Sequence, residues 1–209
     1  MRGKFLLLLL VLTPLPAQAR CVLFEGDSIT APSVSLYGTN GEWPKLVQAL
    51  RPDIIPCNIA RGGKNTLQSL TAIDSTIDWL KSVHGSGLKD GVILIGINNT
   101  IIARSVEDTA LDILAIADHM AARGVTPHIL TLTPALNFPW TNVWARDVSN
   151  AVFALNTLRP PASQRDVPDL RDDFTALSWT SCSTDAIHPA GLACRWRIAN
   201  FVARAVPPQ

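Results

Sequence analysis

Residues 20–32 read RCVLFEGDSITAP, a short apolar run that leads into Gly26-Asp27-Ser28. A short apolar run is typical of a β-strand, and glycine, aspartate and serine are the usual residues of a turn. The stretch therefore predicts a strand that ends in a turn. A serine in this position is either a simple turn residue or an exposed nucleophile, and later parts of the chain decide between these two interpretations.

Further apolar runs predict strands, and amphipathic stretches between them predict helices. Pro56 favours an edge position for the second strand, because proline has no N–H to donate to a neighbouring strand. The run GVILIG is continuously apolar, as expected of a strand covered on both faces. The predicted strands are residues 21–25, 53–58, 91–96, 127–134 and 166–170, and the predicted helices are residues 44–50, 66–83, 105–123, 144–158 and 195–205.

This alternation of strands and helices is typical of a parallel sheet with helices on both faces. The sequence therefore predicts an α/β fold of three layers, α/β/α, with a doubly wound parallel sheet of about five strands. Such sheets bind ligands beyond the carboxyl ends of their strands. The residues that directly follow each strand are therefore the candidates for a functional site.

The first 19 residues have the pattern of a secretory signal peptide. Arg2 and Lys4 precede a short apolar core, and Ala17-Gln18-Ala19 has the small residues of a cleavage site. We predict export to the periplasm or the extracellular space, with a mature domain of residues 20–209. The chain has 18 basic and 17 acidic residues and no second long apolar stretch. This balance argues against nucleic acid as a partner, and we expect no membrane anchor after the signal peptide is removed.

Four polar stretches follow predicted strands and therefore fall at one edge of the sheet. They are GDS at residues 26–28, NIARGGKNT at 58–66, GINN at 96–99 and DAIHP at 185–189. In this order they resemble the four blocks of the SGNH hydrolases, also called GDSL-type esterases and lipases. Those blocks carry Ser, Gly, Asn and His, which here match Ser28, Gly63, Asn98 and His188. The resemblance spans nearly the whole mature chain and implies a flavodoxin-like fold without metal or cofactor.

The chemistry that these residues suggest is acyl transfer to a serine. A serine hydroxyl needs a base to take its proton, and His188 is the candidate base and later the acid. Asp185 lies three residues earlier, where its carboxylate can orient the other ring nitrogen. The resemblance assigns an oxyanion hole to the backbone N–H groups of Ser28 and Gly63 and to the side-chain amide of Asn98.

Two positions differ from the usual pattern of the family. Asn99 stands where the third block usually has aspartate, and Gly62 stands where the second block often has serine. We expect a structural, hydrogen-bonding role for residue 99, so asparagine is expected to be tolerated there. Neither difference removes a group with a role in catalysis.

Four cysteines in an exported chain predict disulfides. A metal site is the weaker interpretation, because the sequence has no CxxC motif and no Cys/His cluster. A Cys182–Cys194 bridge would close a local loop around residues 185–188 and restrain it. Cys21–Cys57 follows by elimination, and whether these two can meet depends on the relative height of their strands.

The sequence thus predicts an exported serine esterase that acts on a small-molecule, carbohydrate or lipid ester. Acyl transfer to another acceptor and thioester cleavage are alternatives that use the same triad. A binding module that has kept the fold but lost the activity is a further alternative, although such a module has no need of Ser28, Gly63, Asn98, Asp185 and His188 together.

Overall fold

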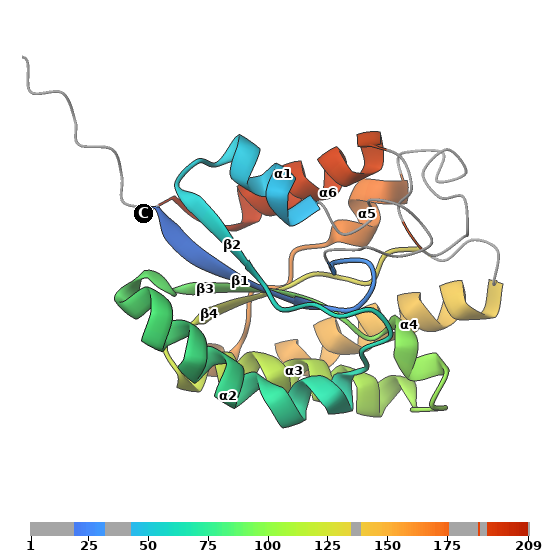
Figure 1. The fold of residues 1–209 in the computed structure, drawn as a ribbon. Coiled ribbons are helices and arrows are strands. Elements are labelled where there is room, and N and C mark those ends of the chain that lie inside the picture. The colour runs from blue at the N-terminus through green and yellow to red at the C-terminus, as the bar shows by residue number, and fades with distance from the viewer. Residues whose placement is uncertain (1–18, 32–42, 135–138, 176–187, 189–191, 209) are drawn as a thin grey trace, which may run out of the picture.

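The computed structural model describes residues 19–31, 43–134, 139–175, 188 and 192–208 (Figure 1). The predicted signal peptide lies outside this part of the chain except for Ala19, as do Asp185 and Cys182. Among the helices within these ranges, none is both long and apolar enough to cross a bilayer.

The centre of the fold is a parallel sheet of four strands in the order β2-β1-β3-β4. After β1, the chain passes to β2 on one side and then returns to β3 on the other, so the switch point lies between β1 and β3. The α/β prediction and the edge position of the strand with Pro56 are confirmed. The strands are β1 (Arg20–Gly26), β2 (Ile54–Asn58), β3 (Asp90–Leu94) and β4 (Thr126–Ile129).

Helices cover both faces of the sheet, with α1, α5 and α6 on one face and α2, α3 and α4 on the other (Figure 1). Local signals determine several helix ends. Asn65 caps α2 in a reciprocal arrangement with Gln68, and Ser105 caps α3. The helices are α1 (Trp43–Leu50), α2 (Thr66–His84), α3 (Val106–Ala122), α4 (Pro139–Thr157), α5 (Leu170–Thr175) and α6 (Leu192–Ala205).

The prediction of a fifth strand at residues 166–170 is wrong, because the structure has no named strand there. Asp166 forms an isolated parallel bridge with His128, and its carbonyl accepts a hydrogen bond of 2.9 Å from Ile129 N–H. Pro168 then interrupts the stretch, because it has no N–H with which to continue the ladder. The chain enters α5 at Leu170, a short helix that the sequence analysis did not predict. Helix α4 also begins five residues earlier than expected.

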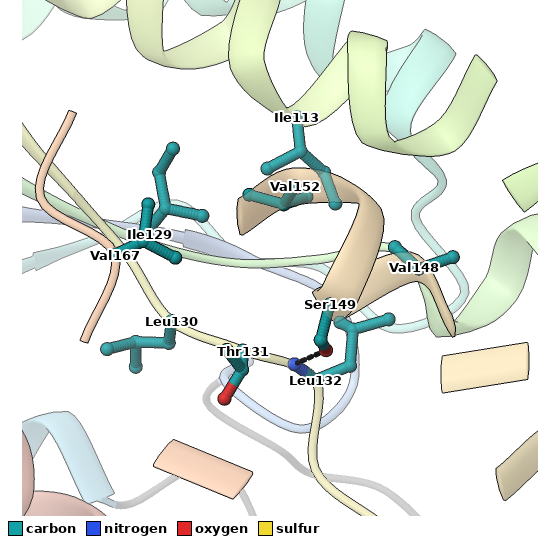
Figure 2. Close-up of a pocket in the computed structure, with 9 residues that line it drawn as sticks. All are labelled: Ile113, Ile129, Leu130, Thr131, Leu132, Val148, Ser149, Val152 and Val167. Atoms are coloured by element: carbon teal, nitrogen blue, oxygen red, sulfur yellow. Dashed lines mark hydrogen bonds between the residues drawn. The ribbon is translucent and has the colours of Figure 1, made fainter. Parts of the chain in front are cut away.

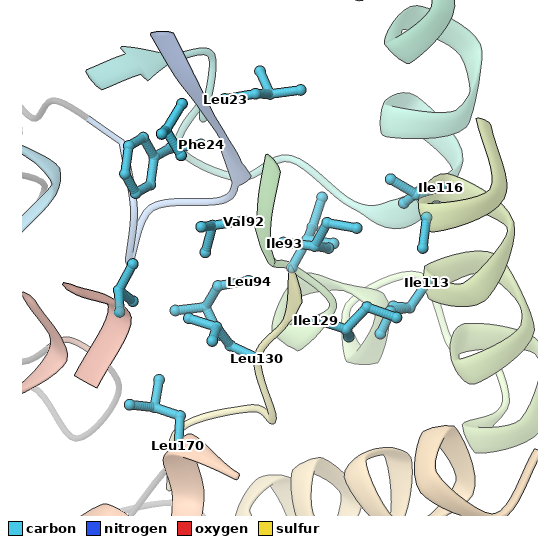
Figure 3. Packing of buried hydrophobic residues seen from close by; sticks show 14 of the residues in the cluster. Leu23, Phe24, Val92, Ile93, Leu94, Ile113, Ile116, Ile129, Leu130 and Leu170 are labelled. Carbon is cyan, nitrogen blue, oxygen red and sulfur yellow. The ribbon is translucent and has the colours of Figure 1, made fainter. Parts of the chain in front are cut away.

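Apolar side chains on both faces of the sheet form the core (Figure 3). All seven residues of β1 are buried. Phe24 packs edge-on against Trp43 of α1, with ring centroids 5.3 Å apart. The indole N–H of Trp43 donates to the carbonyl of Ile29 at 3.0 Å, directly after the turn that carries Ser28. The core therefore also supports the segment on which the candidate site is built.

Cys21 of β1 and Cys57 of β2 form a disulfide between neighbouring strands, with their Cα atoms 5.6 Å apart. Leu23 pairs with Cys57 in the sheet register, so the bridge runs diagonally across two residues. In the part of the chain described, these sulfurs and His84 are the one group of potential metal ligands. Because a metal binds a thiolate, sulfurs that are joined to each other are not available. Cys194 of α6 is also disulfide-bonded, and the pairing with Cys182 stays a prediction.

Candidate active site

The turn after β1 presents Ser28 at the carboxyl edge of the sheet. The backbone carbonyl of Asp27 accepts from the N–H groups of Thr30 and Ala31, at 3.1 and 2.8 Å. Its carboxylate accepts from the N–H of Ile29 at 3.0 Å. Asp27 is thus the structural residue of the turn, and Ser28 is left half-buried beside it.

Only glycine fits at the end of β1. A Cβ atom on Gly26 would lie 2.6 Å from the hydroxyl of Thr30 and 2.7 Å from the carbonyl oxygen of Leu94. Real Cβ atoms do not approach other atoms this closely, and the carbonyl belongs to the neighbouring strand β3. The glycine before Asp27 therefore allows the chain to turn tightly against β3.

The hydroxyl oxygen of Ser28 lies 2.7 Å from Nε2 of His188. This is hydrogen-bond distance, as required of a nucleophile and the base that activates it. The two residues are 160 positions apart in the sequence, so the tertiary fold alone brings them together. Asp185, the predicted orienting acid, lies outside the described residues, and its contact with His188 stays a prediction.

The loop between β2 and α2 runs beside Ser28. A Cβ on Gly62 would lie 3.9 Å from the Cβ of Ser28, and Arg61 N–H donates to the carbonyl of Gly26 at 3.1 Å. Gly63 has a φ of +75° and would have nothing within 4 Å of an added Cβ. The left-handed backbone conformation, rather than crowding, is therefore what favours glycine at position 63.

Asn98 contacts this loop from the other side. It lies in a short 3₁₀ turn, Ile97–Thr100, directly after β3. Its side-chain amide donates to the carbonyl of Lys64 at 3.1 Å, and an amide nitrogen carries a second N–H besides the one in this bond. The structure thus brings Ser28, Gly63 and Asn98 to one edge of the sheet, as the sequence predicted from the ends of the strands.

Asn99 is fully buried and has a structural role. Its amide nitrogen donates to the hydroxyls of Thr66 and Thr109, at 2.7 and 3.0 Å, and its amide oxygen accepts from Thr66 N–H at 3.1 Å. The Thr66 hydroxyl in turn donates to Asp112 at 2.6 Å. These bonds join the turn after β3 to the first turn of α2, as expected for a residue that hydrogen-bonds rather than reacts.

Two buried carboxyl groups belong to this segment, Asp27 in the turn and Glu25 near the end of β1. Burial raises the pKa of Asp27 to about 6, although the N–H of Ile29 and the nearby His188 oppose this shift. Burial also raises the pKa of Glu25, and Lys64 opposes that shift through its charge and its hydrogen bond. The Lys64 ammonium lies 2.7 Å from the Glu25 carboxylate.

The sequence analysis missed this Glu25–Lys64 pair. The available signal was a charged residue at the end of a strand that is otherwise apolar, because a buried charge needs a partner of opposite sign. Lys64 is the one lysine in the four polar stretches at the sheet edge. The two residues are 39 positions apart in the numbering, on different elements, so no local pattern joins them.

A small apolar cavity of about 10 Å³ lies between the end of β4, α3 and α4 (Figure 2). It has room for no more than about one water molecule. The hydroxyl of Ser149 in its wall accepts from Leu132 N–H and donates to the carbonyl of Ala145. The cavity contains none of the predicted site residues, and its polar wall is already hydrogen-bonded, so it is a packing defect of the core and not a substrate site.

No family model and no curated protein matches the sequence. Solved structures do match the fold. TesA is 19% identical and superposes with a TM-score of 0.69 over 90% of this chain and 99% of its own. A catalytic mutant of Axe2, an acetylxylan esterase from Geobacillus stearothermophilus, is 14% identical, with a TM-score of 0.69 over 92% and 96%.

A lipase/acylhydrolase from Enterococcus faecalis is 15% identical, with a TM-score of 0.68 over 91% of this chain and 99% of its own. All three neighbours are under 25% identical to this chain. The chain therefore shares the fold of these three proteins over nearly all of its length, in agreement with the α/β fold class that the sequence predicted. At these identities the likeness establishes the fold alone, and the activity has to be argued from the site.

Proposed function

We propose that the chain is an exported serine esterase that hydrolyses carboxylic esters with Ser28, His188 and Asp185. The observation that carries this proposal is the distance of 2.7 Å between the Ser28 hydroxyl and His188 Nε2. This pair lies at the carboxyl edge of a sheet whose fold is shared with proteins named as esterases. Gly63 and Asn98, which we propose as oxyanion donors together with Ser28, lie at the same edge.

The proposed reaction has two halves. In the first, Ser28 Oγ bonds to the acyl carbon while His188 Nε2 takes the hydroxyl proton. The resulting oxyanion is stabilised by the N–H groups of Ser28 and Gly63 and by the amide of Asn98. The carbon–oxygen bond to the alcohol then breaks, and His188 gives its proton to the departing alcohol. In the second half, His188 activates water, which releases the acid from Ser28.

Export is supported by two independent features. The N-terminal residues have the pattern of a signal peptide, and Cys21 and Cys57 are joined in a disulfide. Structural disulfides persist in oxidising compartments and are rare in the cytosol. The proposed location is therefore the periplasm or the extracellular space.

The substrate class is testable with a series of esters. The mature chain and a Ser28→Ala variant would be assayed on p-nitrophenyl esters of increasing acyl length. We expect activity that depends on Ser28. A preference for acetyl would favour an acetylated carbohydrate, as in the neighbours named acetylxylan esterases, whereas a preference for long chains would favour a lipid ester. Wild-type activity no higher than that of Ser28→Ala on every ester would overturn the proposed function.

A further inference from the structure

The buried ion pair between Glu25 and Lys64 lies between the strand of the nucleophile and the loop beside it. Glu25 has no exposed surface, and Lys64 is 7% exposed. Their charged atoms are 2.7 Å apart. Removing two charges from water is costly, and an apolar pair of similar volume is often at least as stabilising. Stability alone is therefore a poor explanation for an ion pair at this position.

The position of each partner suggests a different role. Glu25 is the second-last residue of β1 and precedes Ser28 by three positions. Lys64 directly follows Gly63. The ion pair thus joins the strand that ends in the nucleophile to the loop that carries the proposed Gly63 donor.

The backbone of Lys64 makes two further contacts in this loop. Its carbonyl accepts from the Asn98 side chain at 3.1 Å, and its N–H donates to the carbonyl of Arg61 at 3.1 Å. Lys64 therefore contacts β1 through its ammonium and the turn after β3 through its carbonyl. All three proposed oxyanion donors, on Ser28, Gly63 and Asn98, are connected through this one residue.

Lys64 lies between two backbone contacts that hold the ends of this loop. At its start, Arg61 N–H is bonded to the carbonyl of Gly26. At its end, Thr66 N–H is bonded to Asn99. Between these two anchors lie Gly62 and Gly63, which have no side chains to pack. The ion pair of Lys64 with Glu25 adds a side-chain contact between this part of the loop and β1.

We propose that Lys64 is a positioning residue for the oxyanion hole and that Glu25 holds it in place. This inference rests on the proposed esterase function. Lys64 acts through its neighbours: the ion pair fixes the loop that carries Gly63, and the Lys64 carbonyl orients the amide of Asn98. Preorganised donors stabilise the transition state because they need no rearrangement during the reaction. Loss of the pair is therefore expected to affect kcat more than KM.

The test compares single and double substitutions in the mature chain. Lys64→Met keeps an unbranched side chain, one atom shorter and without the charge, and Glu25→Gln keeps the shape of its partner. Glu25→Leu combined with Lys64→Met replaces the pair by apolar side chains. For each variant, kcat and KM are measured on the preferred ester, with the melting temperature and the inhibition constant of an alkylboronic acid. The boronic acid forms a tetrahedral adduct with a serine and so reports on the oxyanion hole.

Removal of one oxyanion donor costs about 10²–10³ in rate, and a displaced donor is expected to cost less. We expect kcat to fall by roughly 10- to 100-fold in Lys64→Met and in the double variant. KM should stay within about threefold, and boronic acid inhibition should weaken in parallel with kcat. The double variant should melt at or above the temperature of Lys64→Met, because it leaves no unpaired buried carboxylate, and yet should not regain kcat.

Asp90→Asn is the matched control. Asp90 is buried at the amino-terminal end of β3, away from the carboxyl ends of the strands where Ser28 lies, and it pairs with Arg20. Its loss should therefore lower the melting temperature and leave kcat of the folded enzyme unchanged. A double variant with wild-type kcat and boronic acid affinity would overturn the positioning role while leaving the esterase intact. Wild-type activity no higher than that of Ser28→Ala would instead overturn the esterase proposal, and the positioning role with it.

Discussion

The hydroxyl of Ser28 and the imidazole of His188 lie within hydrogen-bond distance, at 2.7 Å, across 160 residues of sequence. Ser28 lies in the turn after β1, whereas His188 precedes α6, the last helix of the chain. Their meeting at the switch point between β1 and β3 places the pair where open parallel sheets bind their ligands. The predictions below test what this pair and its surroundings do.

His188→Gln is expected to lower kcat/KM by about 10⁴-fold or more, because the Ser28 hydroxyl loses the base that takes its proton. The melting temperature should change little, since His188 is only half-buried. Residues that act as one unit are strongly non-additive. Ser28→Ala combined with His188→Gln should therefore be no slower than Ser28→Ala, as measured by steady-state kinetics. If the losses in kcat/KM of the two single variants instead multiply in the double variant, Ser28 and His188 do not act as one unit.

Asn98→Ala is expected to lower kcat by about 10²–10³ with little change in KM, because one donor to the oxyanion is removed. Asn98→Asp is the matched control, since it keeps the size of the side chain but replaces the donor with an acceptor. It should be at least as slow as the alanine variant. Activity close to that of the wild type in both variants would assign Asn98 to the loop contact with Lys64 alone.

Asn99→Asp is expected to destabilise the protein, even though aspartate is the usual residue at this position in the family that the sequence resembles. The proton of the Thr66 hydroxyl is already donated to Asp112 at 2.6 Å, so a carboxylate at position 99 would face an oxygen without a proton. We expect a loss of about 1–3 kcal/mol in the free energy of unfolding, measured by urea denaturation. Because Asp112 also accepts two hydrogen bonds from Arg104, Asp112→Asn has a cost of its own. Measured against the Asp112→Asn single variant, the loss caused by Asn99→Asp should be smaller. Equal stability of Asn99→Asp and the wild type would contradict the network.

His128 of β4 is expected to make the stability of the fold depend on pH. Burial opposes its charge, but hydrogen bonds with Asp166 at 2.9 Å and Asp90 at 3.3 Å outweigh this and raise its pKa to about 9. A histidine with a raised pKa in the folded state stabilises fully below its ordinary pKa of 6.5, and this contribution is lost as the pH rises through about 9.

The free energy of unfolding should therefore fall between pH 6.5 and 9, by on the order of 2–3 kcal/mol. His128→Gln should be less stable than the wild type at pH 6, and the difference between the two should shrink towards pH 9.5. Urea denaturation at a series of pH values measures both curves. A constant difference across this range would show that His128 does not titrate in the folded protein.

The disulfides are expected to contribute separately to stability and to activity. Cys57→Ser opens the bridge between β1 and β2, and should cost about 2–4 kcal/mol in the free energy of unfolding with little effect on kcat. Cys194→Ser should also lower kcat, because we predict that its partner is Cys182 and that the bridge restrains the loop with His188. Unchanged activity and melting temperature under dithiothreitol, with all thiols shown to be free, would contradict both expectations.

Much of the fold and of the candidate site could be predicted from local patterns. The apolar run that ends at Gly26, the continuous GVILIG run and the periodic helices lie within short windows, and hydrophobic periodicity is a local property. Parallel strands bring their carboxyl ends to one edge. The order of the blocks therefore predicted that Ser28, Gly63 and Asn98 would lie together.

The tertiary structure decided the features that depend on which elements become neighbours. The diagonal register of β1 and β2 allows Cys21 to reach Cys57, and Pro168 leaves the expected fifth strand as a single bridge. The pairing of Glu25 with Lys64 and the approach of Ser28 to His188 join residues far apart in the chain. Such contacts depend on strand order, register and burial, which arise only when distant segments pack together and exclude water.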